Sequence, residues 1–267
     1  MCLILTAHMA HSRYRLVVAA NRDEFLSRST APAAFWPHAS QILGGRDLEK
    51  GGTWMGIAAD GRWAAVTNFR DGRNQAPGTG SRGELVRDFL LSAMQPAEYA
   101  SSLQHTAEGF SGFNLLWGDH DQLYYASNRV DAPPVRLARG VYGLSNGLLD
   151  APWPKVERGK AALRRTLSNI DEPMALTEAL LEVLSDETQA GMDSLPDTGI
   201  DRDAEKLLSA AFICAPGYGT RASTVLLIEH TGQVYLCERS FTQDGKAPED
   251  RRFQFIVSGA ANQPQAD

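Results

Sequence analysis

Strand-like segments in this sequence follow one another in groups, with connections too short to hold a helix. Residues 2–8 and 16–21 are two aliphatic runs separated by a short polar stretch, which predicts a hairpin. Residues 54–58 and 63–67 flank Asp60-Gly61, a strong hairpin signal because glycine tolerates the positive φ of a tight turn. Parallel strands need long crossover connections, so the grouping predicts antiparallel sheets rather than βαβ units.

Helical patterns lie between the groups of strands. Ser81 and Glu84 have the spacing of a capping box, and apolar residues follow them at helical spacing. Pro154 suits the first turn of a second helix, and leucines at helical spacing predict a third over residues 176–184. Six further strand-like runs cover residues 113–117, 123–127, 141–145, 223–229, 234–239 and 253–257.

We therefore predict an α+β fold, a four-layer αββα sandwich in which helices cover the outer faces of two antiparallel sheets. A chain of 267 residues is long enough to bury a sizeable core. Since no linker divides the sequence, residues 1–267 are predicted to form a single domain.

Charge and composition argue against several classes of protein. The 26 basic and 32 acidic residues give a net charge of −6, which is not typical of a nucleic-acid-binding protein. No apolar run approaches the ~18 residues of a membrane span, and the N-terminus lacks the features of a signal peptide. The 3 cysteines do not make a disulfide framework, so we expect a cytoplasmic protein.

Metal and dinucleotide sites are not predicted. His8 and His11 have H-x-x-H spacing but lack the further ligands that would complete a zinc site. The glycines from Gly78 to Gly83 match G-x-G-x-x-G but follow a loop rather than a buried strand. No resident cofactor is expected. Haem stays open as a cargo, because a single axial histidine leaves little sequence signature.

Cys2 follows the initiator methionine, whose removal is efficient before small side chains. Cys2 would then combine a thiol with an α-amine of pKa ~7.7–8.0, which can act as a base at neutral pH. A nucleophile and its base within one residue are a known catalytic arrangement. The alternative is a small apolar residue that opens a buried strand.

The sequence Asn21-Arg22-Asp23-Glu24 stands at the end of the second predicted strand. In a hairpin with the first strand, this cluster lies in the layer near Cys2. An arginine there would lower the pKa of the thiol, and a carboxylate would hold the α-ammonium or orient the arginine. The alternative is a solvated strand end with local ion pairs.

Two further features are candidate contacts for a reacting or charged group. Asn68, Asn114 and Asn146 each stand at a strand end, where an amide can donate to a developing oxyanion. Asparagine is also a common turn former, which is the alternative. The glycines of the GYGTR sequence free backbone amides for an anion and place Arg221 at the mouth of the last sheet, or they form a plain turn.

Nine motifs follow one another along most of the chain. They are MCLI (1–4), NRDE (21–24), GGTW (51–54), TN (67–68), SRG (81–83), FN (113–114), LSN (144–146), WPK (153–155) and GYGTR (217–221). Together they resemble the NRDE family, the family of transport and Golgi organisation protein 2. That family is similar to N-terminal nucleophile hydrolases of the bile-salt hydrolase and penicillin V acylase branch, whose fold is an αββα sandwich.

The resemblance implies catalytic roles for Cys2, Arg22, Asp23, Asn68, Asn146 and Arg221. Cys2 matches the nucleophile, Asn68 an oxyanion-hole asparagine, and Asn146 the asparagine of a T-N-S-P segment. The acylases have the order Arg-Asn-x-Asp, so residues 21–24 match approximately and Glu24 fits the acid's place equally. Five residues are expected to bind substrate or ligand: Asn21, Glu24, Trp54, Asn114 and Tyr218.

The resemblance implies two classes of function, which the sequence does not separate. In the first, Cys2 attacks the carbonyl of an amide or thioester, and its α-amine relays the proton. In the second, a carrier without turnover binds haem, or an acyl-CoA or lipid ligand, on the same scaffold. Arg22 and Arg221 would then meet its carboxylate or phosphate groups. Either way, the expected partner is a small molecule.

Overall fold

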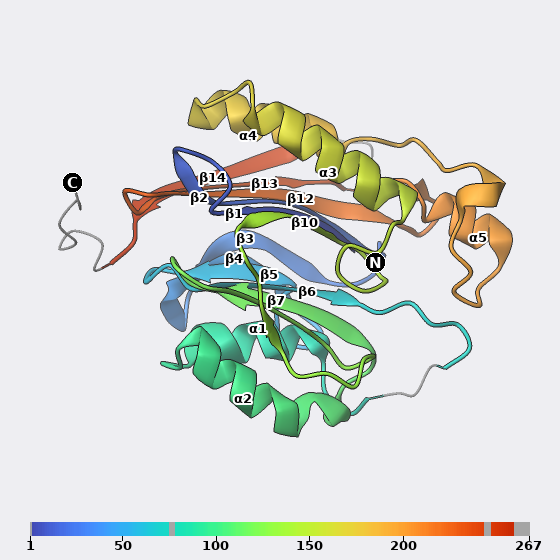
Figure 1. Ribbon diagram of the computed structural model, residues 1–267, viewed down its shortest axis with the longest axis horizontal. Coiled ribbons are helices and arrows are strands. Elements are labelled where there is room, and N and C mark those ends of the chain that lie inside the picture. Colours follow the sequence, from blue (N-terminus) through green and yellow to red (C-terminus); the bar gives the residue numbers. More distant parts are fainter. Residues whose placement is uncertain (1, 75–77, 243–246, 259–267) are drawn as a thin grey trace.

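The computed structural model describes residues 2–74, 78–242 and 247–258. Figure 1 shows four layers, with two sheets face to face in the middle and helices on the outside. Helices α3 (Pro154–Leu167) and α4 (Pro173–Leu184) cover one sheet, and α1 (Arg82–Leu91) and α2 (Pro96–Thr106) cover the other. The predicted αββα sandwich is confirmed.

The first sheet is antiparallel throughout and has the strand order β10-β1-β2-β12-β13-β14, with β11 paired to β12. Its strands are β1 (Cys2–His8), β2 (Tyr14–Phe25), β10 (Gly140–Leu144), β11 (Cys214–Ala215), β12 (Tyr218–Glu229), β13 (Gln233–Ser240) and β14 (Glu249–Ile256). The predicted hairpin of β1 and β2 is confirmed. Strand β2 is longer than predicted, so residues 21–24 lie inside it rather than after its end.

The second sheet is also antiparallel and follows the order of the chain from β3 to β9. Its strands are β3 (Thr30–Trp36), β4 (Ala39–Asp47), β5 (Met55–Ala58), β6 (Trp63–Asn68), β7 (Phe113–Gly118), β8 (Leu123–Ser127) and β9 (Val135–Arg136). Gly61 lies between β5 and β6 with φ 88°, the left-handed conformation that the Asp60-Gly61 turn predicts.

The remaining helical elements are short: η1 (Ala107–Gly109), η2 (Met192–Ser194) and α5 (Arg202–Leu207). Helix α1 begins as predicted, since Ser81 is its N-cap and the Glu84 carboxylate accepts the Ser81 backbone N–H. Pro154 is the first residue of α3, also as predicted. No helix within the described residues is long and apolar enough to cross a membrane.

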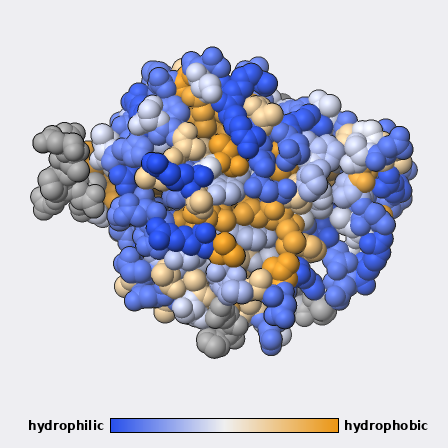
Figure 2. All heavy atoms as spheres, in the orientation of Figure 1, coloured by the Kyte–Doolittle hydropathy of each residue, from blue (hydrophilic) through white to orange (hydrophobic). Residues whose placement is uncertain are grey.

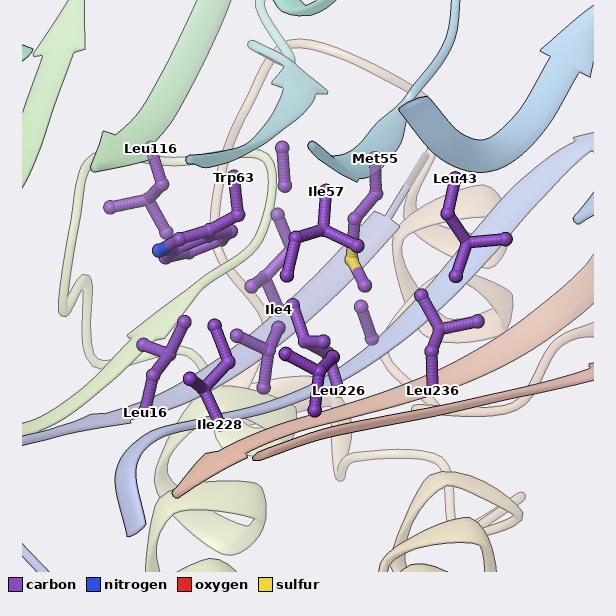
Figure 3. Packing of buried hydrophobic residues seen from close by; sticks show 14 of the residues in the cluster. Ile4, Leu16, Leu43, Met55, Ile57, Trp63, Leu116, Leu226, Ile228 and Leu236 are labelled. Carbon is purple, nitrogen blue, oxygen red and sulfur yellow. The ribbon is translucent and has the colours of Figure 1, made fainter. Parts of the chain in front are cut away.

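The main core fills the space between the sheets, as Figure 3 shows. Side chains from the first sheet (Ile4, Leu16, Leu226, Ile228 and Leu236) meet side chains from the second (Leu43, Met55, Ile57, Trp63 and Leu116). Alternate residues of β1 face opposite ways, so Leu3 and Leu5 pack in a second core under α3 and α4. This alternation decides which side of the sheet each site residue occupies.

Strands β3 and β4 were not predicted, and their composition explains why. Pro32 lies inside β3, which the sheet tolerates because β3 is an edge strand. Gly44 and Gly45 interrupt the pattern of β4, yet both positions need glycine. A Cβ on Gly44 would lie 2.7 Å from the Met55 carbonyl oxygen, and one on Gly45 would lie 2.2 Å from the Trp54 ring.

Replacing Leu226 with alanine tests the core between the sheets. Leu226 is fully buried there, so we expect the free energy of unfolding to fall by about 2–5 kcal/mol. Urea denaturation followed by circular dichroism measures the change. Leu226→Met is the matched control and should cost less than about 1.5 kcal/mol, because it conserves volume. Equal midpoints for Leu226→Ala and the wild type would contradict this packing.

Candidate functional site

The β1–β2 hairpin sets Cys2 opposite Arg22. Opposite residues of an antiparallel pair share a face, and Ile4 shows that this face is the one between the two sheets. Arg22 is 5% exposed, and its guanidinium lies 4.3 Å from the centre of the Trp54 ring. Trp54 in turn covers Gly45, so the bare backbone of β4 makes room for the stack. Arg22 therefore lies inside the sandwich, and Cys2, the first residue of β1, lies partly exposed at its rim.

Burial raises the pKa of the Cys2 thiol above its ordinary value, although Arg22 and a hydrogen bond from the Asp23 backbone act in the opposite direction. At neutral pH the thiol is therefore protonated in this structure. The Cys2 carbonyl accepts a hydrogen bond of 2.9 Å from Ser145 Oγ, which ties the start of β1 to the end of β10. A nucleophile in this position needs a base to take its proton.

Asp23 lies on the other face of β2, under the helices. Burial raises the pKa of its carboxyl, while the charge of Lys155 lowers it. Asp23 Oδ1 accepts a hydrogen bond of 2.7 Å from Thr220 Oγ1. Thr220 Oγ1 itself accepts the Ile213 backbone N–H at 2.9 Å. The carboxylate is thus fixed by β12, which pairs with β2 on the side opposite β1.

Lys155 is a site residue that the sequence analysis missed. It lies in the first turn of α3 and is 2% exposed, and its Nζ has no hydrogen-bond partner among the described residues. Burial lowers the pKa of its ammonium to about 8, against the favourable charge of Asp23. A lysine in the first turn opposes the helix dipole, and this is the sequence signal that could have identified it.

Arg70 and Glu205 form a buried ion pair next to Lys155, and they were also missed. Their side chains are 3.2 Å apart, and the Arg70 guanidinium lies 4.6 Å from the centre of the Trp153 ring. Glu205 also accepts hydrogen bonds from the backbone N–H and the hydroxyl of Thr198. The pair joins the segment after β6 to α5, two parts of the chain that no local pattern relates.

The structure brings Asn68 and Asn146 together at the edge of the two sheets. Asn146 Nδ2 donates to Asn68 Oδ1 at 2.9 Å and to its backbone oxygen at 3.0 Å. Asn146 is fully buried, whereas Asn68 is partly exposed. The side-chain oxygen of Asn68 therefore faces Asn146. The NH₂ group of Asn68 is on the opposite side of its amide, away from Asn146.

Three predicted residues serve as ties within the protein. Asn114 Nδ2 donates to Thr67 Oγ1 and the Gly147 carbonyl, and its oxygen accepts the Tyr125 hydroxyl. Asn21 lies on the helix face of β2, donates to the carbonyls of Leu184 at the end of α4 and of Ala211, and accepts a hydrogen bond from Ser223. Arg221 donates to the carbonyls of residues 25, 26 and 28 and holds the turn after β2.

Tyr218, Glu24 and Arg82 surround the Cys2 end of the hairpin. Burial raises the pKa of the Tyr218 hydroxyl, and the charges of Asp23 and Cys2 add to the effect, so it stays a donor. Glu24 Oε2 lies 3.8 Å from Arg22. Burial lowers the pKa of Arg82, and Cys2 is its foremost favourable charge. The SRG motif contains Arg82, but the sequence analysis gave it no role.

Two cavities lie on the Phe69 side of the site, and Cys2 is in the lining of neither. One of about 540 Å³ is lined by Phe69, Arg70, Asp71, Arg73, Gly147, Leu148, Ala151, Trp153, Pro196, Asp197 and Thr198. Another of about 990 Å³ includes Phe69, Phe110 and Phe113 in its lining. Figure 2 presents the molecule in the orientation of Figure 1. Hydrophobic atoms lie across the middle of the face that it shows, where the two sheets lie one above the other in Figure 1. Among the described residues, no cluster of His, Cys, Asp and Glu could hold a metal ion.

Comparison with other sequences gives clear relatives. Residues 1–243 match the family described as "Transport and Golgi organisation 2". The chain is 40% identical to the Transport and Golgi organization protein 2 homolog of Bos taurus over 250 residues, or 87% of this chain and 88% of that protein. It is 36% identical to the Homo sapiens homolog over 266 residues, or 93% and 95% of the two chains.

Among solved structures, the chain is similar to a mutant of the conjugated bile acid hydrolase from Clostridium perfringens. The TM-score is 0.49 with 9% sequence identity, and the match covers 96% of this chain and 98% of that one. The Caenorhabditis elegans ortholog of N-acylethanolamine-hydrolyzing acid amidase has a TM-score of 0.42 and 14% identity, over 69% and 86% of the two chains.

The ammonium of Lys155 should make stability depend on pH. Its pKa is lowered to about 8 in the folded protein, so the unfolded chain binds more protons between about pH 8 and 10.5. Stability relative to Lys155→Met should therefore rise with pH across that window, by up to about 3 kcal/mol. Urea denaturation at several pH values measures the difference.

The exposed Lys206 on α5 supplies the control, because Lys206→Met should give the same pH dependence as the wild type. A pH-independent difference between Lys155→Met and the wild type would refute the lowered pKa.

Proposed function

The chain belongs to the transport and Golgi organisation 2 family, and we propose that it is a hydrolase of amide or thioester bonds with Cys2 as its nucleophile. The register that sets Cys2 opposite Arg22, with the Asp23 backbone N–H on the Cys2 thiol, carries this proposal. It puts a thiol, a guanidinium and a carboxylate at the open end of one hairpin. The cavity beside Arg70 and Trp153 supports a small-molecule substrate.

The proposed reaction needs the free α-amine of Cys2, which forms when the initiator methionine is removed. The amine accepts the thiol proton, and the sulfur attacks the carbonyl carbon of the substrate. When the tetrahedral intermediate collapses, the carbon–nitrogen or carbon–sulfur bond of the substrate breaks, and the leaving group takes the proton. Water then cleaves the thioester between the acyl group and Cys2. Asp23 would hold and orient the amine.

We assign different roles to the two asparagines. Asn68 turns its amide oxygen to Asn146, so its NH₂ group is the donor that would stabilise the oxyanion. Asn146 is the residue that orients it. Arg22 lies on the same face as Cys2 and would favour the thiolate during attack. One oxyanion donor of this kind is worth roughly 3–4 kcal/mol in acyl transfer.

Intact mass and a Cys2→Ala variant test the proposal together. We expect the purified protein to lack its initiator methionine and to cleave members of a panel of acyl p-nitroanilides and acyl thioesters. Cys2→Ala should lower kcat at least about 1000-fold, since it removes the nucleophile. Cys214→Ala is the matched control and should leave the rate unchanged, because Cys214 is exposed. A retained methionine, or an active Cys2→Ala variant, would rule the mechanism out.

The larger cavity favours a second candidate function, a carrier of haem or another bulky apolar ligand such as an acyl chain. Phe69, Phe110 and Phe113 line this space of about 990 Å³, which lies in the size range of ligand sites. Such a carrier needs no nucleophile.

Titration with haemin tests this second candidate. A carrier should shift the Soret band of haemin at micromolar protein. The Cys2→Ala variant should bind haemin as tightly as the wild type. Phe110→Ala should weaken binding about tenfold, because it removes an aromatic wall of the cavity. A flat titration would exclude haem.

A further inference from the structure

The GGTW and SRG motifs pack directly against each other beside the Cys2 end of the hairpin. A Cβ on Gly52 would lie 2.5 Å from the carbonyl carbon of Gly83, so the two backbones touch. The Thr53 backbone N–H donates to the Gly83 carbonyl at 3.2 Å. This contact fixes Trp54 and Arg82 relative to one another. Two motifs separated by almost thirty residues therefore build one wall of the site.

Two guanidinium groups in this wall lack an adequate counter-charge. Arg22 is 5% exposed, and its Nη1 has no hydrogen-bond partner among the described residues. Arg82 makes no ion pair with a described residue, and its Nη1 donates to the Gly112 carbonyl at 3.3 Å. Glu24 is the carboxylate that acts on both, and it approaches Arg22 no closer than 3.8 Å.

The neighbouring charges do not fill this deficit. Arg28 and Asp47 are 2.6 Å apart and balance each other. Arg221 is directed to backbone carbonyls in the turn after β2. The Asp23 carboxyl lies on the helix side of β2, where the charge of Lys155 acts on it, although its own charge also reaches Cys2 and Arg22. Glu238 is another buried carboxyl on this face, but it accepts the Ala33 backbone N–H, and burial raises the pKa of its carboxyl. Among the described residues, Arg22 therefore has no ion pair shorter than 3.8 Å and Arg82 has none.

We propose that Arg22 and Arg82 form an anion-binding subsite, so that the substrate of Cys2 carries a carboxylate or phosphate group close to the bond that is cleaved. This inference rests on the proposed function for the identity of the reaction. Guanidinium groups bind these anions through paired N–H donors, and the binding is strong where water is largely excluded. Arg82 is then a substrate-binding residue that determines specificity.

Alkylation of Cys2 with two reagents of equal size and different charge tests the subsite. In both reactions a carbon–sulfur bond forms and iodide leaves, but iodoacetate is an anion and iodoacetamide is neutral. The charge state of the thiol affects both rates equally, so it cancels in their ratio. The measured quantity is the rate of alkylation by iodoacetate divided by the rate of alkylation by iodoacetamide. We expect this rate ratio at Cys2 to exceed that at exposed Cys214 about tenfold, and to fall as salt is added.

Variants of α1 complete the test. Arg82→Gln should bring the ratio at Cys2 close to that at Cys214, whereas Arg82→Lys should keep most of the preference because it keeps the charge. Arg87→Gln is the matched control, since Arg87 pairs with Asp88 on the same helix, and its ratio should be that of the wild type. Peptide mass spectrometry of the full chain measures each cysteine separately.

Equal ratios at the two cysteines of the wild type, or an unchanged ratio in Arg82→Gln, would overturn the subsite. Alkylation needs no turnover, so the result is independent of hydrolysis. A preference for iodoacetate in a protein that hydrolyses nothing would keep the subsite and remove the hydrolase.

Discussion

The site depends on one constraint, the register in which β1 pairs with β2. A slip of one residue would turn every side chain of β1 to the other face of the sheet, because side chains alternate along a strand. Packing prevents the slip, since Leu3 and Leu5 fill the core under the helices while Ile4 fills the core between the sheets. The register that satisfies both cores also sets Cys2 opposite Arg22. The geometry of the site is therefore fixed by apolar residues that take no part in its chemistry.

The buried charges around Cys2 are poorly explained as a source of stability. Removing Arg70 and Glu205 from water costs several kcal/mol per ion, and their attraction offsets this only in part. Lys155 is more costly still, because its ammonium is buried without a hydrogen-bond partner among the described residues. A leucine or methionine would fill the same space at lower free energy. Such groups are expected where a protein needs shifted pKa values and a strong local field, which is a property of functional sites.

Much of the fold was predictable because its hairpins are local. The turn at Gly61 and the caps of α1 and α3 are short-range signals, and each was read correctly. Strand β4 was missed because Gly45 is required by the Trp54 ring, a contact made outside the strand. In the site, the sequence indicated the cluster at 21–24 but not which side chains share a face. The partners of Arg70 and Lys155 come from α5 and β2, so only the tertiary structure brings them together.

The position of β2 explains why a charged segment can be a buried strand. Strand β2 lies between β1 and β12, so both of its edges are paired and both of its faces are covered. On the helix face, Asn21 and Asp23 are satisfied by Ser223 and Thr220 of β12. On the other face, Arg22 meets Cys2 of β1 and the Trp54 ring. An edge strand would leave half of these groups without partners, so a site of this composition requires a central strand.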